Sequence, residues 1–338
     1  MTRCQRHSRE LRRFGFFTHW FTHTAFDIPH LKTSVIENPK FIKSEIERPK
    51  SEINTVLCIH MSLFIASLNS GSNGNCYYIG NSHEAVLIDA GISCRETERR
   101  MLRLGLSMRK VKAVFISHEH SDHINGVSVL AKKYQLPVYI TPATLMRGGL
   151  AIDEYLLRPF AVAHVAMIGE LQVTAFPKFH DAVDPCSFVV SFNNIRVGIF
   201  TDIGIACQNV ISHFSQCHAV FLEANYDDDM LDKGGYPYHL KRRIRGGNGH
   251  LSNKQAVELF TKHKAPYLSH LLLSHLSKNN NHPDLVQQLF NACCGDTEII
   301  VASRFVESAV YQIDGQLVAA GSRLKTIEEL KALQTSLF

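Results

Sequence analysis

The hexapeptide HEHSDH (118–123) is the feature that most restricts how this 338-residue chain folds. It follows the apolar run KAVFISH (112–118), so three imidazoles and one carboxylate leave the end of a predicted buried strand together. Side chains grouped in this way can face one cavity from a single turn. The pattern is specific even in a chain with 19 histidines. Its candidate ligands are His118, His120, Asp122 and His123.

Imidazole and carboxylate are the groups that Zn²⁺ accepts as ligands, and the mixture also suits Mn²⁺ or iron. The motif contains no cysteine, which disfavours a thiolate-rich structural zinc site. A catalytic site instead keeps one coordination position open for water. The alternative interpretation is a polar helix cap, in which Asp122 caps a helix that begins near Ile124.

Apolar strands alternate with amphipathic helices from Met61 onward, which is typical of an α/β fold. The expected strands are residues 63–68, 76–80, 85–91, 112–118, 137–141, 171–177, 186–192, 196–202, 219–225, 268–275 and 297–302. The expected helices are residues 94–105, 124–134, 252–263 and 283–293. His180, Asp202 and His275 also follow or end predicted strands, where α/β sheets gather their sites. Each alone is an ordinary surface residue, but together with the hexapeptide they form a set of seven candidate ligands.

The first 60 residues differ from the rest of the chain. They hold ten Lys and Arg against six Asp and Glu, whereas the remainder is nearly neutral, so global charge does not argue for nucleic-acid binding. They are a targeting segment, a flexible arm, or upstream sequence read through before a start at Met61. We favour the last interpretation. We therefore expect residues 1–60 to be a disordered or untranslated extension and residues 61–338 to form one domain.

Nine cysteines without CxxC spacing indicate reduced thiols in a cytoplasmic protein rather than a disulfide framework. No run approaches the roughly 18 apolar residues of a transmembrane helix, and no secretory signal is evident. We therefore expect a cytoplasmic location and no association with a membrane.

The order HxHxDH, His, Asp, His resembles the metallo-β-lactamase superfamily, over roughly residues 61–305. The resemblance implies an αββα sandwich with two divalent metal ions, zinc before manganese. It assigns one ion to His118, His120 and His180. It assigns the other to Asp122, His123 and His275, with Asp202 bridging the two.

Further segments narrow the resemblance to the YycJ/WalJ-type nucleases, which are related to tRNase Z. They are SLNSGSNGNCYYI at the start, FHDAVDPCSFVV around His180, and GHLSN followed by LLSHLSKNNNHP. The match implies that Glu223 and His250 flank the metals. One departure is the long stretch at 227–249. Only 72 residues separate Asp202 from His275, which leaves no room for the large inserted β-CASP domain of the RNase J type enzymes. A long tRNA-clamping arm is also absent from the sequence.

The implied chemistry is hydrolysis of a phosphodiester, because two metal ions activate water and offset the charge of the phosphate. Asp122 and Asp202 would orient the attacking group. His250, held by Glu223, would protonate the leaving alkoxide. The alternative for His250 is a helix-entry residue, with Ser252 as the N-cap of the next helix.

Three segments are candidates for contact with the substrate. The loop SGSNGN (70–75) presents amides that suit a phosphate, although glycine-rich turns are also common without one. A basic cluster at 241–245 suits a nucleic-acid backbone, although charge runs are usually solvated faces. The candidate contacts are Ser72, Asn73, Asn75, Arg243, Arg245, Lys278 and Asn279.

The leading interpretation is a metal-dependent 5′-to-3′ exonuclease that acts on DNA rather than RNA. Its direction and its preference for DNA rest on the resemblance. The alternative enzyme is a thioesterase or lactonase of the glyoxalase II kind, which shares the same metal ligands. The non-enzyme alternative is a metal-binding sensor module, which the seven filled ligand positions disfavour.

Overall fold

The computed structural model describes residues 62–315, and these residues form two seven-stranded sheets. The expectation for residues 1–60 lies outside the described residues. In spatial order the first sheet contains β14 (Tyr311–Ile313), β1 (Leu63–Asn69), β2 (Cys76–Gly80), β3 (Ala85–Ile88), β4 (Val111–Phe115), β5 (Val138–Ile140) and β6 (Leu157–Pro159). The second sheet contains β13 (Glu298–Val301), β12 (His270–Ser274), β11 (Ala219–Glu223), β10 (Ile195–Phe200), β9 (Cys186–Phe192), β8 (Leu171–Pro177) and β7 (Val165–Ile168).

The helices connect these strands. They are α2 (Cys94–Arg103), α3 (Ser121–Ile124), α4 (Val127–Tyr134), α5 (Pro142–Gly148), α6 (Gln208–Phe214), α7 (Asp228–Lys233), α8 (Tyr238–Arg245), α9 (Asn253–His263) and α10 (Pro283–Asn291). Short 3-10 turns lie at Met108–Lys110 and Glu154–Leu156. Residues 62–315 contain no helix that is both long and apolar enough to cross a membrane.

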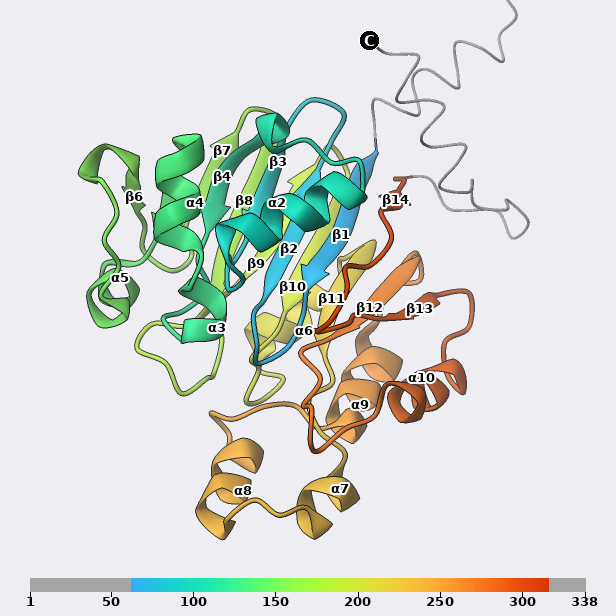
Figure 1. Cartoon of the computed structure of the whole chain (residues 1–338). Coiled ribbons are helices and arrows are strands. Elements are labelled where there is room, and N and C mark those ends of the chain that lie inside the picture. Colours follow the sequence, from blue (N-terminus) through green and yellow to red (C-terminus); the bar gives the residue numbers. More distant parts are fainter. Residues whose placement is uncertain (1–61, 316–338) are drawn as a thin grey trace, which may run out of the picture. The chain divides into compact units, whose positions relative to one another are not determined.

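The two sheets pack face to face with helices on both outer sides (Figure 1). The central core joins side chains of both sheets, such as Tyr77 of β2 and Phe221 of β11, whose ring centroids are 4.8 Å apart. Apolar residues of α2 and α4 cover the outer face of the first sheet. Those of α6, α9 and α10 cover the second. The predicted αββα sandwich is therefore confirmed.

Several elements differ from the sequence-based expectation. The expected strand 85–91 ends at Ile88, because Asp89 turns into the left-handed region with φ 59°. The expected helix 124–134 is two helices, α3 and α4, because the chain bends at Gly126 to pass the carbonyl of Ile92. α3 begins at Ser121 with no side-chain cap, so the alternative in which Asp122 caps a helix is wrong. α5, α6, α7, α8, β6, β7 and β14 were not expected.

A backbone crossing at Gly91 places the hexapeptide. The amide of Gly91 donates to the carbonyl of Asn75 over 2.8 Å, and the amide of Asn75 donates to the carbonyl of Asp122 over 2.7 Å. A Cβ atom at Gly91 would lie only 1.6 Å from the carbonyl oxygen of Asp122. Glycine is therefore required here for space between three backbone segments.

We expect Gly91→Ala to lower the free energy of unfolding by at least about 2 kcal/mol, because the backbone at Asp122 must move. Gly235→Ala is the matched control, since nothing lies within 4 Å of a Cβ at that position. Denaturant unfolding of both variants checks the expectation. Equal free energies of unfolding for the two variants would show that the backbone near Gly91 can accommodate a Cβ atom without cost.

Candidate metal centre

The candidate site residues lie at the ends of neighbouring strands. β3 and β4 are parallel in the first sheet, and β10, β11 and β12 are parallel in the second, so their carboxyl ends gather at one edge of each sheet. Asp89, Asp202 and His275, each just past such an end, all have positive φ, between 56° and 59°. Non-glycine residues in this conformation cost roughly 1 kcal/mol or more, and functional sites often store such strain.

His118, His120 and His180 form the first group of ring nitrogens. Nδ1 of His120 lies 3.1 Å from Nε2 of His118 and 3.3 Å from Nε2 of His180. His118 and His180 are buried, and His120 is partly exposed. Three nitrogens from two separate segments therefore converge on one point, with one imidazole at the surface.

Asp122, His123 and His275 form the second group. Nε2 of His275 lies 3.4 Å from Oδ2 of Asp122, and Nε2 of His123 lies 3.5 Å from the same oxygen. Asp202 lies between the two groups, with carboxylate oxygens 3.3 Å from His123, 3.3 Å from His275 and 3.8 Å from His180. The structure thus brings all seven predicted ligands together.

Hydrogen bonds behind the rings fix which nitrogen faces the cluster. Nδ1 of His118 lies 2.9 Å from Oγ of Ser117, and Nδ1 of His180 lies 3.0 Å from the carbonyl of Gly249. His123 and His275 direct the same nitrogen to buried carboxylates, Asp89 at 2.7 Å and Glu223 at 2.9 Å. Nε2 of each of these four rings faces the cluster, which is how metal-binding histidines are usually held. In His275 the other ring nitrogen, Nδ1, also lies 3.3 Å from Oδ1 of Asp202.

One further observation tests whether a metal fits. Oδ2 of Asp202 is buried and makes no hydrogen bond of acceptable geometry among residues 62–315, although Nε2 of His123 lies 3.3 Å from it. An anionic oxygen in this position is costly to bury unless a cation satisfies it. The donor set of imidazole nitrogens and carboxylates is the one that zinc accepts. The residues present therefore fit a divalent metal ion.

Asp89 was missed as a site residue. It is buried. Its Oδ1 accepts a hydrogen bond from the backbone amide of Ser117, and its Oδ2 accepts one from the hydroxyl of Ser117, each over 2.8 Å. Oδ2 also contacts Nδ1 of His123. The signal was present, because Asp89 ends an apolar run in AVLIDAG as Asp202 ends one in VGIFTD.

We expect Asp89→Asn to weaken metal binding by about 10- to 100-fold, because the ring of His123 loses the carboxylate that orients it. Competition with a chelator of known affinity measures the change. Asp153→Asn, at an exposed position, is the control. Unchanged metal affinity in Asp89→Asn would show that the ring is held without the carboxylate.

Glu223 and His250 lie together beside the cluster. Oε1 of Glu223 is 2.8 Å from Nδ1 of His250 and 2.9 Å from Nδ1 of His275, and its Oε2 accepts from the amides of Ile203 and Leu251. Burial favours the neutral acid, but His250 and these hydrogen bonds outweigh burial and lower the pKa of Glu223 to about 2. Glu223 is therefore an anion that orients both imidazoles. Ser252, two residues after His250, is the N-cap of α9, as the alternative for His250 expected of Ser252.

The buried imidazoles titrate in opposite directions in the metal-free protein. Burial lowers the pKa of His118 well below its usual value, and that of His180 to about 4. For His275, Asp202 and other carboxylates outweigh burial and raise the pKa to about 10. The pKa of His123 is raised for the same reason.

We therefore expect the stability of metal-free protein to peak near pH 6.5, the usual pKa of histidine. Above it, the unfolded chain releases protons that folded His123 and His275 retain, so stability falls as the pH rises toward 10. Below it, the unfolded chain binds protons that folded His118 and His180 do not, so stability falls again. Thermal unfolding in chelator from pH 4 to 10 measures this. A level Tm between pH 6.5 and 10 would contradict the assignment.

The loop at 70–75 is part of the site, but its residues serve different purposes. Asn75 is buried, and its side-chain nitrogen Nδ2 lies 3.1 Å from both Oδ2 of Asp122 and Nε2 of His123. It is therefore placed to position the hexapeptide. Ser72 and Asn73 are exposed and both contact Arg304.

The other predicted substrate contacts lie on exposed segments. Arg243 pairs with Asp181, and Arg245 pairs with Asp232 over 2.5 Å, so both guanidinium groups already have carboxylate partners. Lys278 is exposed. The amide nitrogen of Asn279, also exposed, donates to the hydroxyl of Tyr236 over 3.1 Å.

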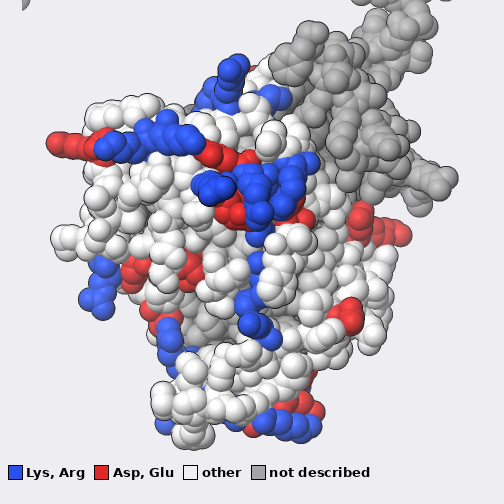
Figure 2. All heavy atoms as spheres, in the orientation of Figure 1, with Lys and Arg blue, Asp and Glu red and all other residues white. Residues whose placement is uncertain are grey.

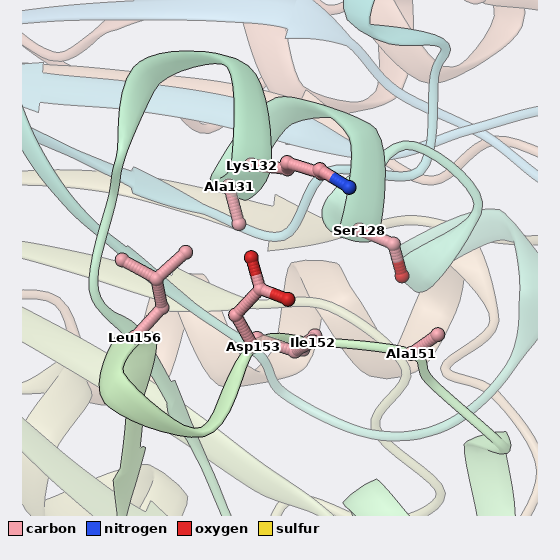
Figure 3. A pocket seen from close by; sticks show the side chains of 7 residues that line it. All are labelled: Ser128, Ala131, Lys132, Ala151, Ile152, Asp153 and Leu156. Atoms are coloured by element: carbon pink, nitrogen blue, oxygen red, sulfur yellow. The ribbon is translucent and has the colours of Figure 1, made fainter.

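Two other surface features are separate from this cluster. Lys and Arg side chains gather around α2 in Figure 2, but they alternate with acids, and pairs such as Arg99–Glu96 and Arg103–Glu307 neutralise them. A hollow of about 230 Å³ lies between α4 and residues 151–156. Figure 3 shows Lys132 and Asp153 among the side chains that line it. None of its lining residues belongs to the metal-type groups found in residues 62–315.

Comparison with known proteins agrees with the fold and the site. Residues 84–275 match the family described as Beta-lactamase superfamily domain. The chain is 34% identical to Exodeoxyribonuclease YycJ of Bacillus anthracis over 232 residues, 67% of this chain and 87% of that protein. It is 31% identical to Exodeoxyribonuclease WalJ of Streptococcus pneumoniae over 238 residues, 68% of this chain and 88% of that protein. The crystal structure of the short form of human tRNase Z shares the fold, with a TM-score of 0.51 and 15% identity over 73% of this chain and 99% of that one.

The chain therefore belongs to the metallo-β-lactamase superfamily, and it is a hydrolase of that fold. Within the superfamily its relatives include the YycJ and WalJ proteins, as the sequence motifs predicted. The fold implies binding of divalent metal, and the groups of His and Asp side chains described above supply candidate ligands.

Proposed function

We propose that this chain is a metal-dependent nuclease that removes nucleotides from DNA in the 5′-to-3′ direction. The observation that carries the proposal is a set of seven candidate ligands beside a carboxylate–imidazole pair, Glu223 and His250. Two adjacent metal positions and one proton donor are what hydrolysis of a phosphodiester requires. The names of the YycJ and WalJ relatives, both exodeoxyribonucleases, favour DNA as the substrate and an end as the point of attack.

Two neighbouring positions would hold the metal ions. The first position is formed by His118, His120 and His180, the second by Asp122, His123 and His275, with Asp202 facing both. Bound divalent ions would activate water and offset negative charge on the phosphate. Asp89, Ser117, Glu223 and Gly249 hold the rings from behind, so the positions are oriented before metal arrives.

His250 is the residue we assign to the leaving group. Because anionic Glu223 can only accept, Nδ1 of His250 carries a proton toward it. The imidazole is partly exposed, and because Nδ1 faces Glu223, Nε2 is the nitrogen that would meet a substrate. From there His250 would deliver a proton to the departing alkoxide, while Glu223 holds the ring in place.

Assays with end-labelled strands test this proposal. Metal-reconstituted protein is incubated with single- and double-stranded DNA, and with RNA, each labelled at the 5′ or the 3′ end. We expect immediate release of 5′-labelled mononucleotide from DNA and progressive shortening of 3′-labelled DNA, both lost in Asp122→Ala. Turnover of thioesters or lactones without cleavage of either polymer would replace the nuclease with the glyoxalase II kind of activity.

A further inference from the structure

Arg304 has an arrangement that the seven candidate ligands do not explain. It lies three residues beyond β13, is half-buried, and has no carboxylate within 4.0 Å among residues 62–315. Its Nη2 donates instead to the hydroxyl of Ser72 over 3.2 Å and to the carbonyl of Leu276 over 3.1 Å. Burial lowers the pKa of Arg304, and Tyr236 partly offsets this by raising it. A half-buried guanidinium with only neutral neighbours retains its positive charge for an external anion.

Four separate segments meet around this side chain. Asn73, from the loop after β1, donates to the carbonyl of Arg304 over 2.9 Å. Tyr236 lies in the segment before α8 and receives a hydrogen bond from Asn279, which follows β12. The guanidinium therefore contacts the hydroxyl of Ser72, with further amide and hydroxyl groups on the segments beside it, and has no carboxylate partner among residues 62–315, a combination that suits a phosphate group.

This cluster adjoins the candidate metal centre. Leu276, which accepts from Arg304, directly follows His275 in the chain. The amide of His275 donates to Oγ of Ser70 over 2.8 Å, and the amide of Ser70 donates to the carbonyl of Ser303 over 3.2 Å. Gly71 leaves room for the guanidinium, since a Cβ there would lie 2.7 Å from Nη2 of Arg304. The loop, the last candidate ligand and Arg304 are thus one connected unit.

We propose that Arg304, with Ser72, Asn73, Tyr236 and Asn279 around it, binds a phosphate group of the nucleic-acid strand beside the one that is hydrolysed. This inference rests on the proposed nuclease function and specifies a second point of contact with its substrate. The paired Arg243 and Arg245 are poorer candidates for this contact, because a phosphate must compete with Asp181 and Asp232 for them. A contact on one side of the hydrolysed bond fixes the position of the strand end relative to the metal centre.

Binding of a fluorescent single-stranded oligonucleotide to full-length protein tests the proposal, with Asp122→Ala in the background to prevent cleavage. We expect Arg304→Ala to weaken binding by about tenfold or more. The slope of log K against log salt should fall by about 0.7, the change for one phosphate contact on a single strand. Arg158→Ala is the matched control, because Arg158 is exposed and its guanidinium, like that of Arg304, donates to backbone carbonyls and has no carboxylate partner among residues 62–315.

A second variant protects the test against misfolding. Ser72→Asp keeps Arg304 but places a carboxylate on its guanidinium, and we expect the same loss of binding without a lower Tm. Oligonucleotides with a 5′-phosphate and with a 5′-hydroxyl distinguish the source of the phosphate. Loss on both identifies an internal phosphate, and loss on the phosphorylated strand alone identifies the terminal one.

Two negative results have different meanings. If the parent protein binds the strand and Arg304→Ala binds it equally well with the same salt slope, the phosphate contact is wrong and the nuclease proposal stands. If the parent protein does not bind nucleic acid at all, the proposed function and this inference both fail.

Discussion

Replacing Asp202 with asparagine is expected to lower kcat for phosphodiester hydrolysis at least about 10³-fold. The carboxylate lies 3.3 Å from both His123 and His275, and its buried Oδ2 makes no hydrogen bond of acceptable geometry among the described residues. Asparagine keeps the size of the side chain but removes the charge between the two groups of candidate ligands. We therefore expect weaker metal binding at both positions, with the fold retained.

The effect is measured as kcat together with metal content at equilibrium. Asp284→Asn is the control, since Asp284 is exposed at the start of α10 and belongs to none of the groups of candidate ligands. Full activity in Asp202→Asn, with metal content like that of the parent protein, would remove Asp202 from the centre and the bridging assignment with it.

Replacing His250 with alanine is expected to lower kcat on DNA by about 10²- to 10⁴-fold while metal content stays unchanged. The reason is the proton that the departing alkoxide requires. In a p-nitrophenyl phosphodiester the leaving group is p-nitrophenolate, a stable anion that needs no such proton. On this substrate we therefore expect kcat of the variant to fall less than about tenfold. The difference between the two substrates separates proton donation from a structural role.

His164→Ala provides the comparison, because His164 is exposed and stacks on Phe160. An equal loss of kcat on DNA and on the p-nitrophenyl ester in His250→Ala would mean that His250 shapes the site without donating a proton. Loss of metal in the same variant would instead make His250 a third imidazole of the second group, a position that its distance of 3.9 Å from Asp202 allows.

The strand ends were the most predictable part of the molecule. The boundaries of β2, β8 and β9 agree with the expected strands, because unbroken apolar runs are bounded there by polar turns. Candidate ligands that follow such runs, like His180 and His275, meet because strand ends share an edge. Their order along the chain, and not their periodicity, revealed which family they resemble.

Residues that act through others were harder to predict. Asp89 carries the same signal as Asp202, but its partners Ser117 and His123 come from another strand end, so its role depends on tertiary contact. α7 and α8 appeared only as a long charged stretch, since α8 buries no residue and lacks an apolar stripe to reveal it. Figure 1 shows both helices projecting from the end of the sandwich.

The sequence alone also overestimated which basic side chains are unpaired and able to bind an anion. Arg243 and Arg245 stand in a basic run, yet acids distant in the sequence neutralise both. Arg304 stands alone in SRF near the end of the described residues, and only the fold shows that it contacts the loop at Ser72. Local sequence identifies a cation, but the fold determines which cations remain unpaired.

Titration of metal-free protein with zinc, followed by hydrolysis of end-labelled single-stranded DNA, tests the central claim most directly. The account predicts no cleavage without metal and a rise to a plateau at about two equivalents per chain, because two groups of candidate ligands share Asp202. Cleavage by the metal-free protein, or a plateau at one equivalent, would contradict the assignment of two metal positions to these seven side chains.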